Sequence, residues 1–237
     1  MNAAAPRAQV FVLLDEASAQ HAALDISTAL AQLLERRLQL VFVQSAAALA
    51  AVELSATRVL AHSTARWTRL AAPDIERAWQ AQTQRLRTLA ERSSQPRAVH
   101  WSLRVVRGAL HDAALDLLPE TDLLLLGGAA AAFALGRQGV ALRKLTALDD
   151  GGRCGSEAVR LAERLAERLG ARLAVRRVEA AQALPAVAAD TDLLVLPRTL
   201  AQGQALRALA TRPTLVVGLG TPGAVEPAAQ APQRTLR

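Results

Sequence analysis

Two glycine-rich turns mark the places where the backbone of this chain could bind an anion. The first is Gly127-Gly128, after the apolar run 123–126, and the second is the segment from Asp149 to Ser156, which reads Asp-Asp-Gly-Gly-Arg-Cys-Gly-Ser. Glycine lets backbone N–H groups approach a phosphate closely, and the N-terminus of a following helix adds donors and a favourable dipole. Tight turns require the same glycines, so a plain strand-to-helix connection is the alternative reading of both segments.

Residue types that perform catalysis are present, but without the spacing that catalysis requires. The four histidines form no HxH or HExxH pattern, and the single cysteine, Cys154, has no His or Cys neighbour at metal-ligand spacing. Asp112 and Asp116 lie one helical turn apart, as expected of a solvated helix face. The chain also contains no GxSxG turn and no GxxxxGK[ST] loop. We therefore predict that it is not an enzyme.

Composition predicts one large or two small domains with a substantial core. The chain has 237 residues, of which 51% are hydrophobic. Its net charge of +7 could indicate a polyanion ligand, but the arginines are dispersed among acids and aromatic residues make up only 3%, which argues against nucleic acid. No apolar run reaches the roughly 18 residues of a membrane span, and the N-terminus lacks a secretion signal. We therefore expect no membrane insertion and a cytoplasmic location.

Apolar runs alternate with helical patterns along the chain, which predicts a parallel sheet with right-handed crossovers. A helix capped by Ser18 should follow the first strand, and a second helix should open at Asp74. Residues 101–107 alternate between apolar and polar side chains, as in a half-exposed strand near a sheet edge. Residues 45–72 are assigned only as a long excursion that can hold a short helix. The expected strands are 10–14, 38–43, 101–107, 121–126, 144–149, 173–175, 191–196 and 215–218.

The chain also matches itself at two offsets. An offset of 135 residues carries Asp15 onto Asp150. Farther along the chain, an offset of 70 residues carries Thr121-Asp122 onto Thr191-Asp192. The offset falls by 65, so 65 residues are missing from the second copy. We predict a first unit in residues 9–142 and a truncated second unit in 143–220, with flexible segments at 1–8 and 221–237. Residues 144–149 match the first strand of the second unit, yet they stand where a fifth strand of the first unit should be. Both assignments remain open.

Two stretches of the chain resemble the universal stress protein family. Residues 105–128, Val-Val-Arg-Gly-Ala-Leu-His-Asp-Ala-Ala-Leu-Asp-Leu-Leu-Pro-Glu-Thr-Asp-Leu-Leu-Leu-Leu-Gly-Gly, are similar to the family's strand, glycine, helix and Ala-Asp-Leu-Ile-Val-Met-Gly pattern. Residues 149–178 resemble its opening strand, Asp-Gly-Ser turn and helix. The resemblance implies an α/β fold of two Rossmann-like units with parallel sheets, in strand order 3-2-1-4-5 for the full unit. It also implies ATP or AMP at the carboxyl ends of strands one and four.

The phosphate-binding motif of the family is incomplete in this chain. Nucleotide-binding members carry Gly, two residues, Gly, nine residues, and then Gly followed by Ser or Thr. Gly127 matches the first glycine, Ala130 stands at the second position, and Gly139 reaches the third only with a gap. The second unit has Pro, Leu and Ala at the three positions, and Glu16 after the first strand would repel a triphosphate. The cofactor-binding candidates implied by the resemblance are Asp15, Gly127, Gly128, Gly139, Asp150, Gly151, Gly152, Arg153 and Ser156, the last of which should cap a helix.

These departures predict weak or lost adenine-nucleotide binding. We expect a non-catalytic stress-response or regulatory module that acts through protein contacts, as a homodimer or with another protein partner. An ATP-binding protein with slow ATP hydrolysis and a basic polyanion-binding protein are the alternatives.

One further hypothesis concerns both glycine turns. If strand 144–149 lies beside strand 121–126, Gly127-Gly128 and Gly151 to Ser156 would flank a single composite anion site, with Arg153 supplying positive charge.

Overall fold

The structure is a computed structural model, and it describes residues 9–16, 18, 20–53, 58–61, 66–69, 71–127, 142–178, 191–202 and 213–218. The predicted flexible segments 1–8 and 221–237 lie outside these ranges, as do Gly128 and Gly139. The elements of the N-terminal part are β1 (Gln9–Leu14), α1 (Gln20–Leu33), β2 (Arg37–Ser45), α2 (Ala46–Glu53), β3 (Arg58–Ala61), β4 (Arg66–Arg69), α3 (Ala72–Ser94), β5 (Trp101–Gly108), α4 (Leu110–Leu117) and β6 (Leu123–Leu126). Those of the C-terminal part are β7 (Lys144–Asp149), α5 (Arg153–Leu169), β8 (Arg172–Arg177), β9 (Leu193–Pro197) and β10 (Thr214–Val217).

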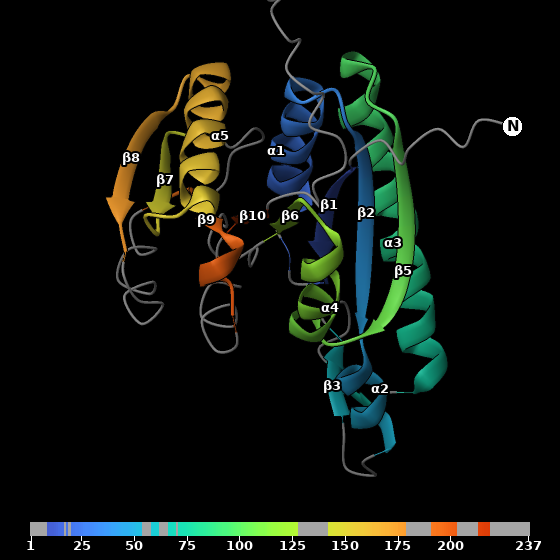
Figure 1. Cartoon of the computed structure of the whole chain (residues 1–237). Helices are drawn as coiled ribbons and strands as arrows, with labels where there is room; N and C mark the ends of the chain where they lie inside the picture. Colours follow the sequence, from blue (N-terminus) through green and yellow to red (C-terminus); the bar gives the residue numbers. More distant parts are fainter. Residues whose placement is uncertain are drawn as a thin grey trace, which may run out of the picture.

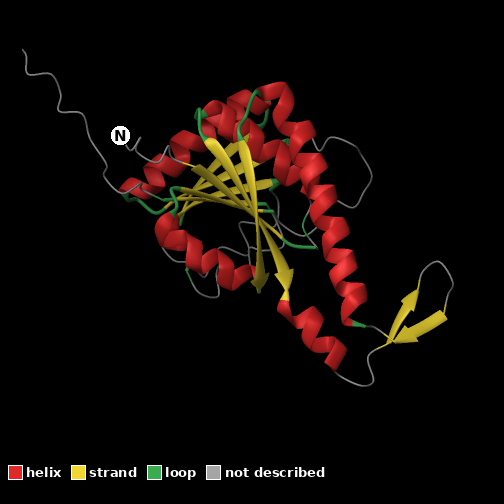
Figure 2. Cartoon of the chain, turned by 90° about the vertical axis from the view of Figure 1, so that its right-hand side faces the viewer, coloured by secondary structure: helices red, strands yellow, loops and turns green. Residues whose placement is uncertain are grey.

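One twisted sheet runs through the whole molecule, with helices on both faces (Figures 1 and 2). Its eight strands have the order β5-β2-β1-β6-β10-β9-β7-β8. All neighbouring strands are parallel except β6 and β10, which are antiparallel. The predicted α/β class with parallel strands is therefore confirmed, and the two sets of strands are joined edge to edge into one sheet.

The four parallel strands β5-β2-β1-β6 follow the predicted order 3-2-1-4. The fifth place, beside β6, is taken by β10 from the C-terminal part, in the antiparallel direction. Strand 144–149 is β7, which pairs with β8 and β9 and does not contact β6. The assignment of this strand left open by the sequence is thereby decided, because β9 and β10 stand between β7 and β6.

The apolar strands are buried because helices cover both faces of the sheet. The alternation along β6 makes this visible: Leu123 and Leu125 pack into the core on the side of α1, α3 and α5, whereas Leu124 and Leu126 pack into the core on the side of α4. All four side chains are buried. The expected half-exposed edge strand is β5, in which Val105 remains 40% exposed.

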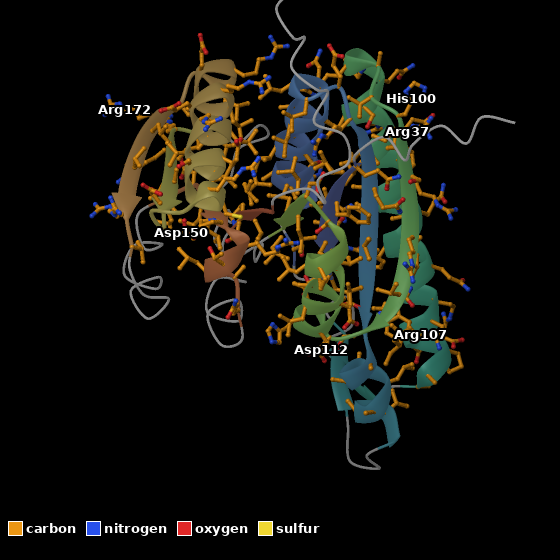
Figure 3. All side chains as sticks on the ribbon, in the orientation of Figure 1. Arg37, His100, Arg107, Asp112, Asp150 and Arg172 are labelled. Carbon is orange, nitrogen blue, oxygen red and sulfur yellow. The ribbon has the colours of Figure 1, made fainter. Side chains whose placement is uncertain are left out.

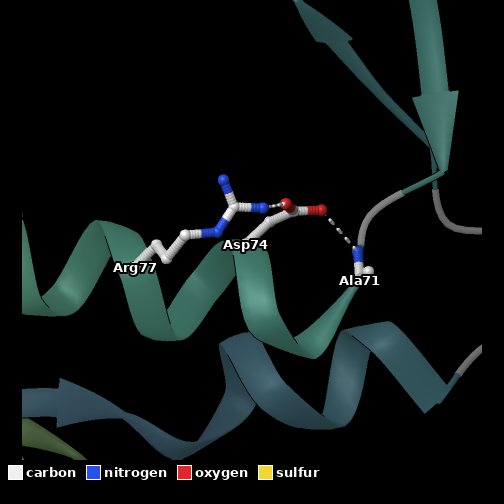
Figure 4. Close-up of polar contacts among 3 residues, drawn as sticks. All are labelled: Ala71, Asp74 and Arg77. Atoms are coloured by element: carbon white, nitrogen blue, oxygen red, sulfur yellow. Dashed lines mark hydrogen bonds and ion pairs between the residues drawn. The ribbon is translucent and has the colours of Figure 1, made fainter.

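The excursion between β2 and α3 contains the expected short helix, α2, and also an antiparallel hairpin of β3 and β4 that the sequence pattern did not predict. Figure 2 shows this hairpin projecting from the body of the molecule. The following helix begins at Ala72, two residues before the predicted start at Asp74. Asp74 instead lies in the first turn, where its carboxylate accepts the Ala71 N–H at 3.3 Å and pairs with Arg77 (Figure 4). No helix within the described ranges combines the length and apolarity needed to cross a membrane.

Candidate functional site

The glycine turn between β7 and α5 binds carboxylates of its own chain. Asp149 Oδ1 accepts the N–H of Gly151 at 2.8 Å. Asp150 Oδ1 accepts the N–H groups of Gly152 at 2.9 Å and Gly155 at 3.1 Å. These are the donors that a glycine-rich turn offers to a phosphate, and here they are directed at two side chains within the turn.

Asp150 also connects this turn to the neighbouring strand end. Its Oδ2 accepts a hydrogen bond from the Thr199 hydroxyl, which lies in the short 3-10 turn Arg198–Leu200 after β9. Burial raises the pKa of Asp150, but the hydrogen bonds from Thr199, Gly152 and Gly155 together bring that pKa below its ordinary value. The carboxylate therefore stays charged and connects the carboxyl ends of β7 and β9.

The close approach of α5 to the end of β7 depends on glycine at position 155. A Cβ atom there would lie 2.5 Å from Asp149 Oδ1 and 2.7 Å from the Asp150 backbone nitrogen. The prediction that Ser156 caps this helix is wrong, because the N-cap is Gly152 and the Ser156 hydroxyl donates back to the Gly152 carbonyl at 3.2 Å. The carboxylate of Asp150 instead accepts the N–H groups of Gly152 and of Gly155 in the first turn of the helix. Arg153 is exposed at the first position of the helix.

The corresponding turn after β1 is closed by different contacts. The Ser18 hydroxyl donates to Asp15 Oδ1 at 2.6 Å and accepts the Asp15 N–H at 2.9 Å. Ser18 was expected to cap α1, but its hydroxyl turns back to Asp15. Gly127 lies against this turn: its N–H donates to the Leu13 carbonyl at 3.0 Å, and a Cβ at Gly127 would lie 2.5 Å from a Leu14 methyl group.

Glu16 has a structural role that sequence reasoning missed. Its carboxylate accepts the Trp79 indole N–H at 2.5 Å and the Ser45 backbone N–H at 3.4 Å, and it thereby links the ends of β1 and β2 to α3. Trp79 is buried, with only 4% of its surface exposed. The Arg107 guanidinium lies 5.5 Å from the centre of the Trp79 ring. The sequence gives one weak signal for this contact. A buried tryptophan needs a hydrogen-bond acceptor for its indole N–H, and Glu16 is an acid at a strand end.

The structure brings the site candidates together in two separate groups. Asp15 and Gly127 meet through Ser18 at the carboxyl ends of β1 and β6, whereas Asp150 to Ser156 lie at the carboxyl end of β7. β10 runs antiparallel to β6, and β9 and β7 run parallel to β10. The carboxyl ends of β7 and β9 therefore lie on the side of the sheet where the amino end of β6 lies. The hypothesis of one composite anion site is therefore wrong. Figure 3 shows Asp150 below α5 and Arg107 beside β5, on opposite sides of the view.

Within the described ranges, no group of three or more His, Cys, Asp or Glu side chains could hold a metal ion. Asp112 and Asp116 are exposed on α4, as predicted for a solvated face.

The sequence matches no known protein-family model and no curated protein. Among solved structures, the chain is similar in shape to a universal stress protein from Archaeoglobus fulgidus DSM 4304, with a TM-score of 0.43 and 7% sequence identity. The matched region covers 89% of this chain and 96% of that protein. Values this low assign no function.

Proposed function

We propose that this chain is a non-catalytic stress-response or regulatory module of universal stress protein type, in which the adenine-nucleotide site of the C-terminal half has been lost. The observation that carries the proposal is the capture of the glycine-turn N–H groups by Asp149 and Asp150. A phosphate at this turn would have to displace both carboxylates, and it would then lie within a few ångströms of two negative charges. The Thr199 hydroxyl holds Asp150 between the carboxyl ends of β7 and β9, where a nucleotide would lie.

The proposal includes a duplication of one unit. Strands β2-β1-β6 and β8-β7-β9 have the same chain order and the same spatial order, and α1 and α5 follow β1 and β7 respectively. Among the described residues, each half lacks a different outer strand of the 3-2-1-4-5 order. The first half has no fifth strand there, and the second half has no third strand there. The pairing of β10 with β6 compensates for the first loss, because β10 covers the edge of β6.

The protein-interaction role is supported by the two open edges of the sheet, β5 and β8. On β8, Val175 is 50% exposed between Ala174 and Arg176. Two β8 strands paired antiparallel about Val175 would place valine opposite valine and Arg176 opposite Ala174, so that no two arginines face each other directly. A homodimer through this edge is therefore compatible with its charge.

Calorimetric titration with ATP and AMP tests the loss of the nucleotide site. We expect no saturable binding at the β7–α5 turn by the wild-type protein at millimolar nucleotide. The variants Arg153→Glu, at the start of α5, and Arg168→Glu, in the last turn of the same helix, form a matched pair. Saturable binding that Arg153→Glu abolishes and Arg168→Glu preserves would contradict the proposal.

Light scattering tests the association surface. We expect a dimer in solution, which Val175→Arg converts to a monomer and Val105→Arg, on the opposite edge, leaves intact. A monomeric wild-type protein, or a dimer unaffected by Val175→Arg, would exclude self-association through β8.

A further inference from the structure

A cavity of about 450 Å³ lies where the two halves of the molecule meet, between α1 and α5. Figure 1 shows these two helices side by side on the same face of the sheet, and α5 donates hydrogen bonds to the end of α1. The floor of the cavity is formed by the start of β6 and the end of β10. The cavity therefore exists only because β10 pairs with β6, and it is separate from the glycine turn that holds Asp150.

Among the described residues, three arginines and two acids line the wall of this cavity. Arg36 pairs with Asp122 at 3.6 Å, and Arg160 pairs with Glu157 at 3.1 Å. Arg164 instead donates to a neutral acceptor, the Leu33 carbonyl, at 3.3 Å. Within the described ranges, no carboxylate lies within ion-pair distance of Arg164. Its guanidinium is therefore the excess positive charge of the cavity, and it retains donors for a further partner.

The remaining wall of the cavity is apolar. Leu34, Leu123, Leu161 and Val217 line it together with Gly218. A volume of this size is typical of pockets that hold small molecules. A ligand that matches both surfaces would place an oxyanion on the arginines and a compact apolar body against the leucines, because a guanidinium fork fits the two oxygens of a phosphate or carboxylate.

A neighbouring cavity of about 400 Å³ shares Arg36 but differs in its electrostatics. It lies between the C-terminal ends of α1 and of the 3-10 turn Gln95–Arg97, and Figure 3 shows Arg37 and His100 on this side. Helix C-termini direct carbonyl oxygens outward, and Arg97 donates to one of them, that of Ser93, at 3.2 Å. Arg97 there stabilises a helix end, whereas Arg164 lines only the cavity beside α5. The inference therefore rests on the cavity that contains Arg164.

We propose that the cavity between α1 and α5 binds a small amphipathic oxyanion, in which a phosphate or carboxylate group is attached to a compact apolar body. Arg164 contacts the oxyanion, with Arg160 and Arg36 beside it, and the leucines contact the body. This inference does not depend on the proposed loss of the nucleotide site, which concerns the turn between β7 and α5 and other residues.

Calorimetric titration of the full chain with phenyl phosphate, benzoate and inorganic phosphate tests the proposal. Phenyl phosphate or benzoate should bind with one-to-one stoichiometry, and inorganic phosphate should bind at least about tenfold more weakly because it lacks the apolar body. Saturable binding by only one of the two aromatic anions identifies the oxyanion as phosphate or carboxylate. No saturable binding of either, or equal binding of inorganic phosphate, would overturn the proposal.

Arg164→Gln and Arg168→Gln form the matched pair for locating the site. Both arginines are exposed on α5, one turn apart, and each donates a single hydrogen bond to α1, at 3.3 Å and 3.2 Å respectively. Only Arg164 lines the cavity. Arg164→Gln should weaken binding about tenfold or more, as expected for the loss of a charge-assisted hydrogen bond, and Arg168→Gln should change it less than about twofold. Equal weakening by both variants would indicate binding to general positive charge and would reject the site.

Discussion

The carboxylate of Asp150 occupies the backbone N–H groups of the glycine turn in the C-terminal half. Asp150 accepts hydrogen bonds from Gly152, Gly155 and Thr199, and in doing so it takes the place that a ligand oxyanion would occupy. The sequence could place Asp150 and the glycines in one turn, because an apolar strand ends there and a helix follows. It could not predict that the carboxylate folds back into the turn, because that depends on side-chain rotation and on Thr199, which is 49 residues away.

The lowered pKa of Asp150 gives its contribution to stability a defined dependence on pH. A carboxyl group whose pKa is lower in the folded than in the unfolded protein stabilises the fold above the unfolded value, near 3.8, and loses that contribution as the pH falls through the folded value. Urea unfolding should therefore show Asp150→Ala to be about 1–2 kcal/mol less stable than wild type at pH 7, as for the loss of a helix-capping residue. The difference should shrink below pH 3.8. A difference that stays constant down to pH 2.5 would mean that Asp150 is not held as a carboxylate.

Gly155 tests the close approach of α5 to β7. Gly155→Ala should lower the unfolding free energy by about 1–3 kcal/mol, because the new methyl group would overlap Asp149 Oδ1 and the Asp150 backbone nitrogen. Gly170 ends the same helix with φ +65° and has open space around it, so Gly170→Ala should cost only about 1 kcal/mol of backbone strain. Thermal unfolding of the two variants compares the sites directly. An equal or smaller loss for Gly155→Ala would refute the packing described here.

At the scale of elements, the sequence predicted where most strands lie along the chain, but it predicted only some of their neighbours in the sheet. Continuous apolar runs identify strands buried on both faces, and every strand expected from such a run is present. The place of 144–149 could not be read from the sequence, because its pattern fits two positions equally well. The hairpin of β3 and β4 was missed because residues 45–72 have weak periodicity. The antiparallel pairing of β6 with β10 joins segments almost 90 residues apart, and no local signal specifies it.

The repeated Thr-Asp dipeptide before β6 and β9 has different roles in its two copies. The Asp192 carboxylate accepts the N–H groups of Arg143 at 2.8 Å and Lys144 at 3.0 Å, and thereby fixes the start of β7 beside β9. The Asp122 carboxylate pairs with the partly exposed Arg36 at 3.6 Å. Asp192→Ala should therefore cost about 1–3 kcal/mol, and Asp122→Ala less than about 1 kcal/mol, in chemical denaturation. A larger loss of stability for Asp122→Ala than for Asp192→Ala would show that Asp192 does not fix the start of β7 beside β9.

At the scale of the whole molecule, β10 joins the two halves into one sheet, and we expect them to unfold together. Leu215 on β10 is fully buried opposite Leu125 on β6, and each half would leave a long apolar strand edge uncovered without the other. Leu215→Ala should cost about 2–5 kcal/mol. Hydrogen exchange should show equal loss of protection at β1 and at β7, which lie on either side of the junction. Loss of protection confined to β7 would mean that the halves unfold independently.

The loss of the nucleotide site is tested most directly by the small molecules that leave the purified protein when it is denatured. The captured glycine turn predicts that chromatography and mass spectrometry of the released fraction detect no adenine nucleotide in stoichiometric amount. Release of one ATP or AMP per chain by the wild-type protein but not by Arg153→Glu would contradict the account, because the carboxylates of Asp149 and Asp150 could not then fill the turn in the native protein.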